Sequence, residues 1–176
     1  MSLPTRARIA GILAACLVLL GSTGALAGFG PSVDVLIGLG NPPDVGDGTI
    51  NTTGAGQEVT GVGCPGDKQT FYILIQNQDY APDAFKVKRS SGYSNGYRVR
   101  YFDANGTDVT GKVSAGTFFT PFVESGGTYL MTATVKVRQF ATAFSSTSRL
   151  ITVASANSFY TVKDAVRFTE EIDLGC

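Results

Sequence analysis

Few side chains in this sequence have the types and spacing that catalysis needs. The chain contains no histidine and no tryptophan. Nucleophiles activated by histidine and most zinc sites depend on an imidazole, so these kinds of site are excluded. Carboxylates are present, but a catalytic pair needs a pocket, and the sequence places none. We therefore expect no catalytic residues, no enzymatic activity and no cofactor.

Three cysteines offer the most specific chemistry. Cys16 lies in the apolar N-terminal segment, whereas Cys64 and Cys176 lie outside it. Two cysteines in an exported chain permit one intramolecular disulfide. An intermolecular bridge and two free thiols are the alternatives.

Two loops carry weaker candidates for binding. Asp44 and Asp47 lie in a glycine-rich loop whose oxygen atoms are a weak calcium candidate, although the loop lacks the closing glutamate of an EF-hand and turn chemistry explains it as well. Tyr80 and Tyr93 lie in two loops that we expect to share one region. Exposed tyrosines stack on sugar rings or partner proteins, so these two form a candidate binding surface.

The first 27 residues have the pattern of a secretory signal peptide. Arg6 and Arg8 precede an apolar run at residues 9–20, and residues 25–27 (Ala-Leu-Ala) form a cleavage pattern. The run is too short for a membrane-spanning helix, although an uncleaved anchor is the alternative. Residues 13–16 also resemble a lipobox, which would make Cys16 a lipidated N-terminus. We expect cleavage after Ala27, no transmembrane segment thereafter, and one domain at residues 28–176.

The charges of that domain do not predict a nucleic-acid partner. Outside the leader, the chain has 12 basic and 14 acidic residues. Five basic residues do cluster in sequence, but they alternate with apolar residues, which indicates the solvated faces of two strands. They are Lys86, Lys88, Arg89, Arg98 and Arg100.

Short β-strands account for most of the remaining sequence. Alternating or apolar runs separated by Gly, Pro, Asn and Asp predict an all-β sandwich of about eight to nine strands, and no segment has helical periodicity. Asn105-Gly106 predicts a type I′ hairpin turn. Ten segments are candidates for these strands: residues 32–39, 57–62, 69–77, 84–89, 97–103, 107–113, 116–123, 128–138, 149–156 and 162–174.

The most apolar of these strands, residues 69–77, is apolar on both faces, as a central strand is. Residues 67–89 thus predict two central strands, one from each sheet, joined by residues 76–83.

Four of these segments resemble bacterial extracellular immunoglobulin-like modules, such as the CARDB adhesion-like domains and the sandwich modules attached to α-galactosidases. The segments are residues 51–57, 70–77, 83–87 and 97–102. Residues 126–128 look like the turn before strand E of those modules, with Gly126 in place of the usual proline. The resemblance implies an immunoglobulin-like antiparallel β-sandwich, a surface location and no shared catalytic residues.

The resemblance also implies which cysteines meet. In such a sandwich the short strand before the first central strand pairs in parallel with the last strand. The ends of residues 57–62 and 162–174 would then lie side by side, which brings Cys64 and Cys176 within disulfide range. We expect that bond.

Three functions remain in competition. The first is a secreted or cell-surface structural or adhesive protein, with an extracellular protein or polysaccharide as its partner. The second is a carbohydrate- or cell-wall-binding module that uses Tyr80 and Tyr93. The third is a self-associating filament subunit, in which residues 28–39 leave their own domain and add as a strand to a neighbour.

Overall fold

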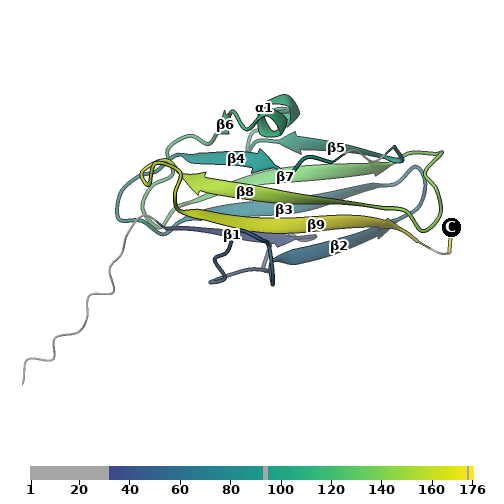
Figure 1. The fold of residues 1–176 in the computed structure, drawn as a ribbon, viewed down its shortest axis with the longest axis horizontal. Coiled ribbons are helices and arrows are strands. Elements are labelled where there is room, and N and C mark those ends of the chain that lie inside the picture. Colours follow the sequence, from purple (N-terminus) through teal and green to yellow (C-terminus); the bar gives the residue numbers. More distant parts are fainter. Residues whose placement is uncertain (1–31, 93–94, 174) are drawn as a thin grey trace, which may run out of the picture.

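Two β-sheets packed face to face form the protein, and their strands run along its long axis (Figure 1). The computed structural model describes residues 32–92, 95–173 and 175–176. The expected leader with Cys16, residues 28–31 and Tyr93 lie outside the described residues. None of the helices in these described ranges is long and apolar enough to cross a membrane.

Nine strands and one short helix make up the described part of the chain. The first sheet has the strand order β1–β3–β7–β5, and the second has the order β2–β9–β8–β4–β6. The elements are β1 (Val33–Gly38), β2 (Glu58–Gly63), β3 (Lys68–Asn77), β4 (Phe85–Arg89), β5 (Tyr97–Phe102), α1 (Thr110–Ala115), β6 (Phe118–Phe119), β7 (Thr128–Val137), β8 (Ser146–Ser155) and β9 (Lys163–Ile172).

The pairing of the strands is that of an immunoglobulin-type sandwich. Neighbouring strands are antiparallel, apart from β2 and β9, which run parallel. The order β1–β3–β7–β5 facing β9–β8–β4 matches the two sheets of that fold. The predicted fold class is therefore confirmed, and β3 and β4 lie in opposite sheets, as expected for residues 67–89.

The core lies between the sheets and follows the alternation of the strands. On β7, Met131 and Ala133 are buried, whereas Lys136 on the other face is exposed. On β3, Phe71 is fully buried but Tyr72 is only half-buried. β3 is a central strand, as predicted, because it lies between β1 and β7, and its outer face is only partly covered because it is an outside face of a two-layer sandwich.

A helix replaces the strand predicted at residues 107–113. Residues Thr110–Ala115 form α1, which ends at Gly116 in the left-handed conformation (φ 67°). Val113 is the one buried residue of this single turn. A segment with one buried residue has no hydrophobic periodicity that would indicate a helix. Its β-branched residues therefore led to the prediction of a strand. The strand expected at residues 116–123 shortens to Phe118–Phe119 at a sheet edge, next to Pro121.

The hairpin at Asn105-Gly106 exists, but its turn type differs from the prediction. A type I′ turn needs positive φ at both central residues. Gly106 has φ 77°, whereas Asn105 does not have a positive φ. Asp103 accepts hydrogen bonds from the N–H groups of Asn105 and Thr107 through its Oδ1 atom, at 2.9 Å and 2.8 Å. This carboxylate stabilises a longer loop closed by the left-handed glycine.

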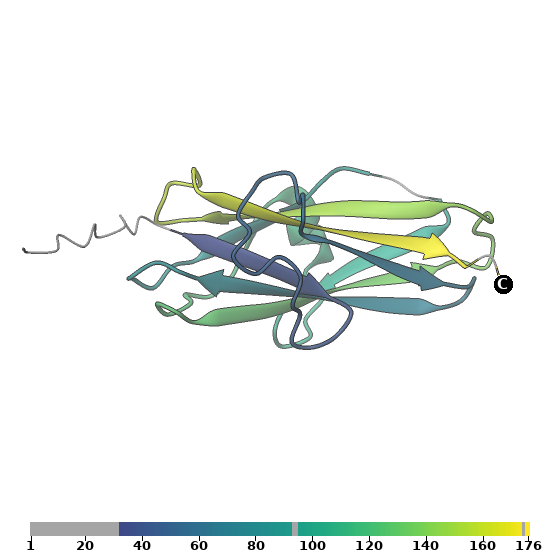
Figure 2. The same cartoon turned by 90° about the horizontal axis from the view of Figure 1, so that it is seen from below.

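β1 lies at the edge of its sheet but is completely buried. It pairs with β3 on one side, and the connection from β1 to β2 folds across its other side (Figure 2). There Asp164 accepts a hydrogen bond from the N–H of Val35 (2.7 Å), and Gln57 donates to the carbonyl oxygen of Val35 (3.1 Å). Burial raises the pKa of Asp164. The structure thus places β1 inside its own domain, as its first strand.

Candidate functional site at the two ends of the sandwich

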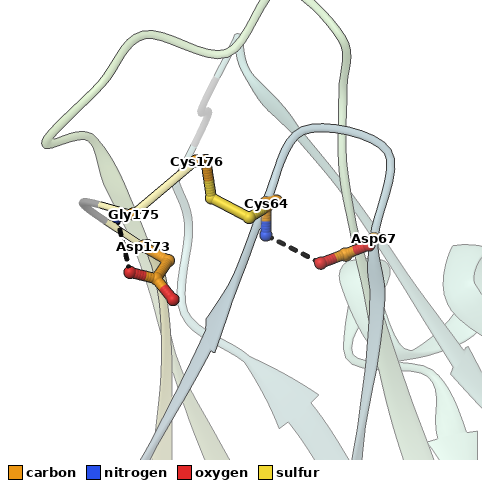
Figure 3. Close-up of a disulfide and its surroundings, with 5 residues drawn as sticks. All are labelled: Cys64, Asp67, Asp173, Gly175 and Cys176. Carbon is orange, nitrogen blue, oxygen red and sulfur yellow. Dashed lines mark hydrogen bonds between the residues drawn. A yellow bond between two sulfur atoms is a disulfide. The ribbon is translucent and has the colours of Figure 1, made fainter.

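A disulfide closes one end of the sandwich, and we call this the disulfide end (Figure 3). Cys64 and Cys176 are bonded, with their Cα atoms 5.6 Å apart. The parallel register of β2 and β9 sets Gly63 opposite Ile172, so the chain brings both cysteines to the same place. Asp67 accepts a hydrogen bond from the N–H of Cys64 (2.8 Å) and fixes the turn. The predicted disulfide is confirmed.

A buried carboxyl group lies under the strand that leads to this disulfide. Glu170 is fully buried on the inner face of β9, and neither of its carboxyl oxygens has a hydrogen-bond partner among the described residues. Gly61 and Gly63 leave the space for it: a Cβ atom at Gly61 would overlap Oε2, and one at Gly63 would lie 2.9 Å from Oε1. Burial, and secondarily the negative charge of Asp67, raise the pKa of Glu170 to about 7.

The sequence reasoning missed Glu170, although a signal was present. Val166, Phe168 and Ile172 share its face of an alternating strand. Because side chains alternate between the two faces of a strand, a glutamate two positions from Phe168 and from Ile172 points into the core when they do. The Gly-x-Gly pattern of β2 would have been the second indication of a buried group.

Exposed aromatic side chains gather at the opposite end, which we call the aromatic tip. Tyr80 is 65% exposed, Phe122 is 75% exposed and Phe159 is 87% exposed. They lie in three different connections, β3–β4, β6–β7 and β8–β9. Large apolar side chains that gather on one surface are typical of an interaction site.

Hydrogen bonds join the three loops of the aromatic tip to one another. Asp83 is buried and accepts hydrogen bonds from the Oγ of Ser155 and from the N–H of Asn157 (3.0 Å). Asp83 also pairs with Val123 in an isolated antiparallel bridge. Ser125 donates to the carbonyl oxygen of Asp79, beside Tyr80. The aromatic tip is therefore a fixed surface rather than three independent loops.

The structure describes only one of the two tyrosines that the sequence placed in one region. Tyr80 lies at the aromatic tip, whereas the connection that contains Tyr93 leaves β4 at Arg89 and enters β5 at Tyr97, toward the disulfide end. Tyr93 itself lies outside the described residues. The two loops therefore do not form one surface, and Phe122 and Phe159, which the prediction did not include, accompany Tyr80 instead.

The calcium candidates do not gain a ligand set. Asp44 and Asp47 are both exposed. Across the described ranges, no group of three or more Asp, Glu, Cys or His residues could hold a metal ion. Asp34, which is buried nearby, accepts hydrogen bonds from the N–H of Gly48 (2.8 Å) and from Gln78 (3.0 Å). Within the loop, the carbonyl oxygen of Gly46 accepts a hydrogen bond from the N–H of Thr49 (2.8 Å) and so serves turn formation.

Comparisons with known proteins define no family for this chain. No protein-family model matches the sequence, and no curated protein matches it. Among solved structures, a family 123 glycoside hydrolase from Clostridium perfringens is similar over 81% of this chain and 27% of its own length, with 9% identity and a TM-score of 0.49. The chain thus spans about a quarter of that enzyme.

Two further solved structures have comparable similarity. PapD-like domain 7 of human CEP192 matches 79% of this chain and 84% of its own length, with 10% identity and a TM-score of 0.44. BcpA, the major pilin subunit of Bacillus cereus, matches 81% of this chain and 40% of its own length, with 10% identity and a TM-score of 0.40. At these values the similarities carry no functional argument.

Proposed function

We propose that this protein is a secreted or cell-surface β-sandwich with a structural and adhesive role and without catalytic activity, and that the aromatic tip is its contact surface. The observation that carries the proposal is the set of three exposed aromatic side chains on loops that hydrogen bonds lock together. An exposed aromatic surface on a rigid frame binds a partner at a small entropic cost. The likeness to CARDB-type modules agrees with this role.

Two further observations support the proposed location and chemistry. The Cys64–Cys176 disulfide fits an oxidising compartment outside the cytosol. The lack of histidine removes the common catalytic arrangements that depend on an imidazole. The burial of β1 within its own sheet favours the adhesive role over a filament built by strand donation.

Retention of coated beads on whole bacterial cells under buffer flow tests the proposal, because cells present both surface proteins and polysaccharides. We expect beads that carry the protein to be retained more than uncoated beads. A variant with Tyr80→Ser, Phe122→Ser and Phe159→Ser should lose most of that retention while keeping its melting temperature.

The matched control replaces exposed aromatic residues elsewhere on the molecule. Phe140 is 60% exposed and Phe144 is 82% exposed, and both lie in the β7–β8 connection at the disulfide end. Phe140→Ser with Phe144→Ser should leave retention unchanged. An equal loss in this control would show that the aromatic tip is not the contact surface, and wild-type beads that behave like uncoated ones would refute the adhesive role.

A further inference from the structure

A hollow on the outer face of the second sheet carries a concentration of positive charge. It has a volume of about 410 Å³, and its lining includes Lys86, Lys88, Arg89 and Lys163, together with Tyr160, and no carboxylate. We call it the cationic groove. The sequence pattern predicted only a solvated strand face for the first three of these residues.

The register of the strands explains the shape of the cationic groove. Ala154 on β8 is opposite Lys86 on β4 and opposite Lys163 on β9. These three residues therefore form one row across the sheet, with a buried methyl group between two long cationic side chains. Neighbouring strands are about 5 Å apart, so the two lysine Cα atoms lie roughly 10 Å apart. Leu150, farther along β8, extends the apolar floor.

No ion pair between described residues neutralises the charges of the cationic groove. The described residues contain two ion pairs, Arg100–Asp108 and Arg167–Glu58, and neither includes a residue of the groove. The Arg89 guanidinium donates to Ser114 Oγ (2.8 Å), which is a neutral acceptor. Several cations around one hollow raise the local positive potential, and an anion relieves it.

A turn with unusual backbone angles places an aromatic ring at the rim of the cationic groove. Phe159 and Tyr160 have φ values of 51° and 64°, in a left-handed region that bulky residues rarely adopt. The N–H of Tyr160 donates to the carbonyl oxygen of Ser155 (2.9 Å), which holds the turn. The Lys86 ammonium lies 5.4 Å from the centre of the Tyr160 ring and 6.0 Å from that of Phe119. Ring and ammonium thus occupy fixed positions relative to each other.

We propose that the cationic groove binds an acidic polysaccharide. Lys86 and Lys163 would pair with the acidic groups of successive sugars on either side of Ala154, and the face of one sugar ring would lie on Tyr160. Lysine suits this partner because its compact charge needs no fixed bidentate geometry. This site adjoins the aromatic tip, because Phe159 of the tip and Tyr160 of the groove lie in one turn, but it does not depend on the proposed adhesive role.

Nucleic acid fits the cationic groove less well than a polysaccharide. Single-stranded nucleic acids stack successive bases on several aromatic platforms, and this groove has one aromatic ring in its lining.

Calorimetric titration of the folded, oxidised protein with polygalacturonate tests the proposal, with neutral dextran and single-stranded DNA as the comparison polymers. We expect binding to polygalacturonate that weakens with added salt, and little binding to dextran. Lys86→Gln with Lys163→Gln should weaken polygalacturonate binding at least tenfold, and Tyr160→Ala should weaken it without changing its salt dependence.

The matched control removes the same charge from the other sheet. Lys68 on β3 is directly opposite Lys136 on β7, and both are exposed. Lys68→Gln with Lys136→Gln should leave the affinity within twofold of wild type. Three results would overturn the proposal: no binding to polygalacturonate, an equal loss in the control variant, or tighter binding of DNA than of polygalacturonate. These variants leave Tyr80, Phe122 and Phe159 unchanged. None of the three results therefore tests the proposed role of the aromatic tip.

Discussion

The Glu170 carboxyl shows how one residue couples the pH to the stability of the disulfide end. Its pKa is about 7 in the folded protein and 4.5 in an unperturbed chain. The folded protein therefore holds this proton more tightly than the unfolded chain. The stabilising contribution is complete below about pH 4.5 and is lost as the pH rises through 7.

Glu170→Gln should remove this pH dependence. The variant should match the wild type near pH 4 and exceed its free energy of unfolding by about 3 kcal/mol at pH 8, since each pKa unit corresponds to about 1.4 kcal/mol. Urea denaturation at a series of pH values measures the difference. Glu171→Gln is the control because its side chain is exposed one position along β9. A wild-type-like pH profile for Glu170→Gln would show that Glu170 is not the group responsible.

Two tyrosines of β5 give opposite predictions for the loss of a hydroxyl group. The Tyr101 hydroxyl is buried and has no partner among the described residues, and burial raises its pKa. The Tyr97 hydroxyl donates to the carbonyl oxygen of Ser145. Tyr101→Phe should raise the free energy of unfolding by about 1 kcal/mol, whereas Tyr97→Phe should lower it by about the same amount. Thermal and urea denaturation measure both, and a destabilised Tyr101→Phe variant would mean that its hydroxyl is satisfied.

At the scale of elements, β2 pairs beside β9 in the second sheet, and its glycines leave room for a side chain of β9. Gly61 and Gly63 face Glu170, so the second sheet has a strand whose backbone packs directly on a buried carboxyl group. This contact joins β2 to the last strand in addition to their parallel hydrogen bonds.

Gly61→Ala should lower the free energy of unfolding by about 1 to 3 kcal/mol, because the new methyl group overlaps Glu170. Gly111→Ala is the control: a Cβ there meets no atom within 4 Å, and alanine favours helix α1 by up to about 1 kcal/mol. The double variant Gly61→Ala/Glu170→Ala should lose less free energy of unfolding than the two single variants lose in total. Urea denaturation of all three variants measures this. Strict additivity would show that the two residues do not touch.

The elements that sequence predicts well are those whose burial alternates over many residues. β7 and β3 have ten residues each, and the alternation of β7 and the apolar run of β3 identified both strands to within a residue. Helix α1 has one buried residue, Val113, and so carries no periodicity to detect. The turn at residues 103–106 depends on the carboxylate of Asp103, which dipeptide preference does not include.

The candidate sites were less predictable than the strands. Cys64 and Cys176 could be paired from the expected topology, because a parallel strand pair fixes where the strand ends meet. The cationic groove requires the register that sets Lys86 and Lys163 on either side of Ala154, and a shift of one residue would point them to the other face. Phe122 and Phe159 lie in loops, where the sequence has no periodicity. Their location at one end of the sandwich therefore could not be predicted.

At the scale of the whole molecule, the disulfide links residues that are 112 positions apart. Closing a loop of this length restricts the unfolded chain, so Cys64→Ser with Cys176→Ser should lower the free energy of unfolding by about 4 to 5 kcal/mol. Urea denaturation of the variant and of the wild type, with and without reducing agent, measures this. The reduced wild type should behave like the variant, and a difference below about 1 kcal/mol between variant and oxidised wild type would contradict the prediction.

The same bond also determines how the molecule responds to tension. β1 begins at the aromatic tip and Cys176 lies at the other end, so a pull between Val33 and the last residue acts along the strands (Figure 1). With the bond intact, only the chain before Cys64 can be drawn out, roughly 100 Å at about 3.5 Å per residue. Reduction would also release the 112 positions between the cysteines, on the order of 400 Å more. The disulfide therefore limits the extension of the chain to about a fifth of what the reduced chain allows.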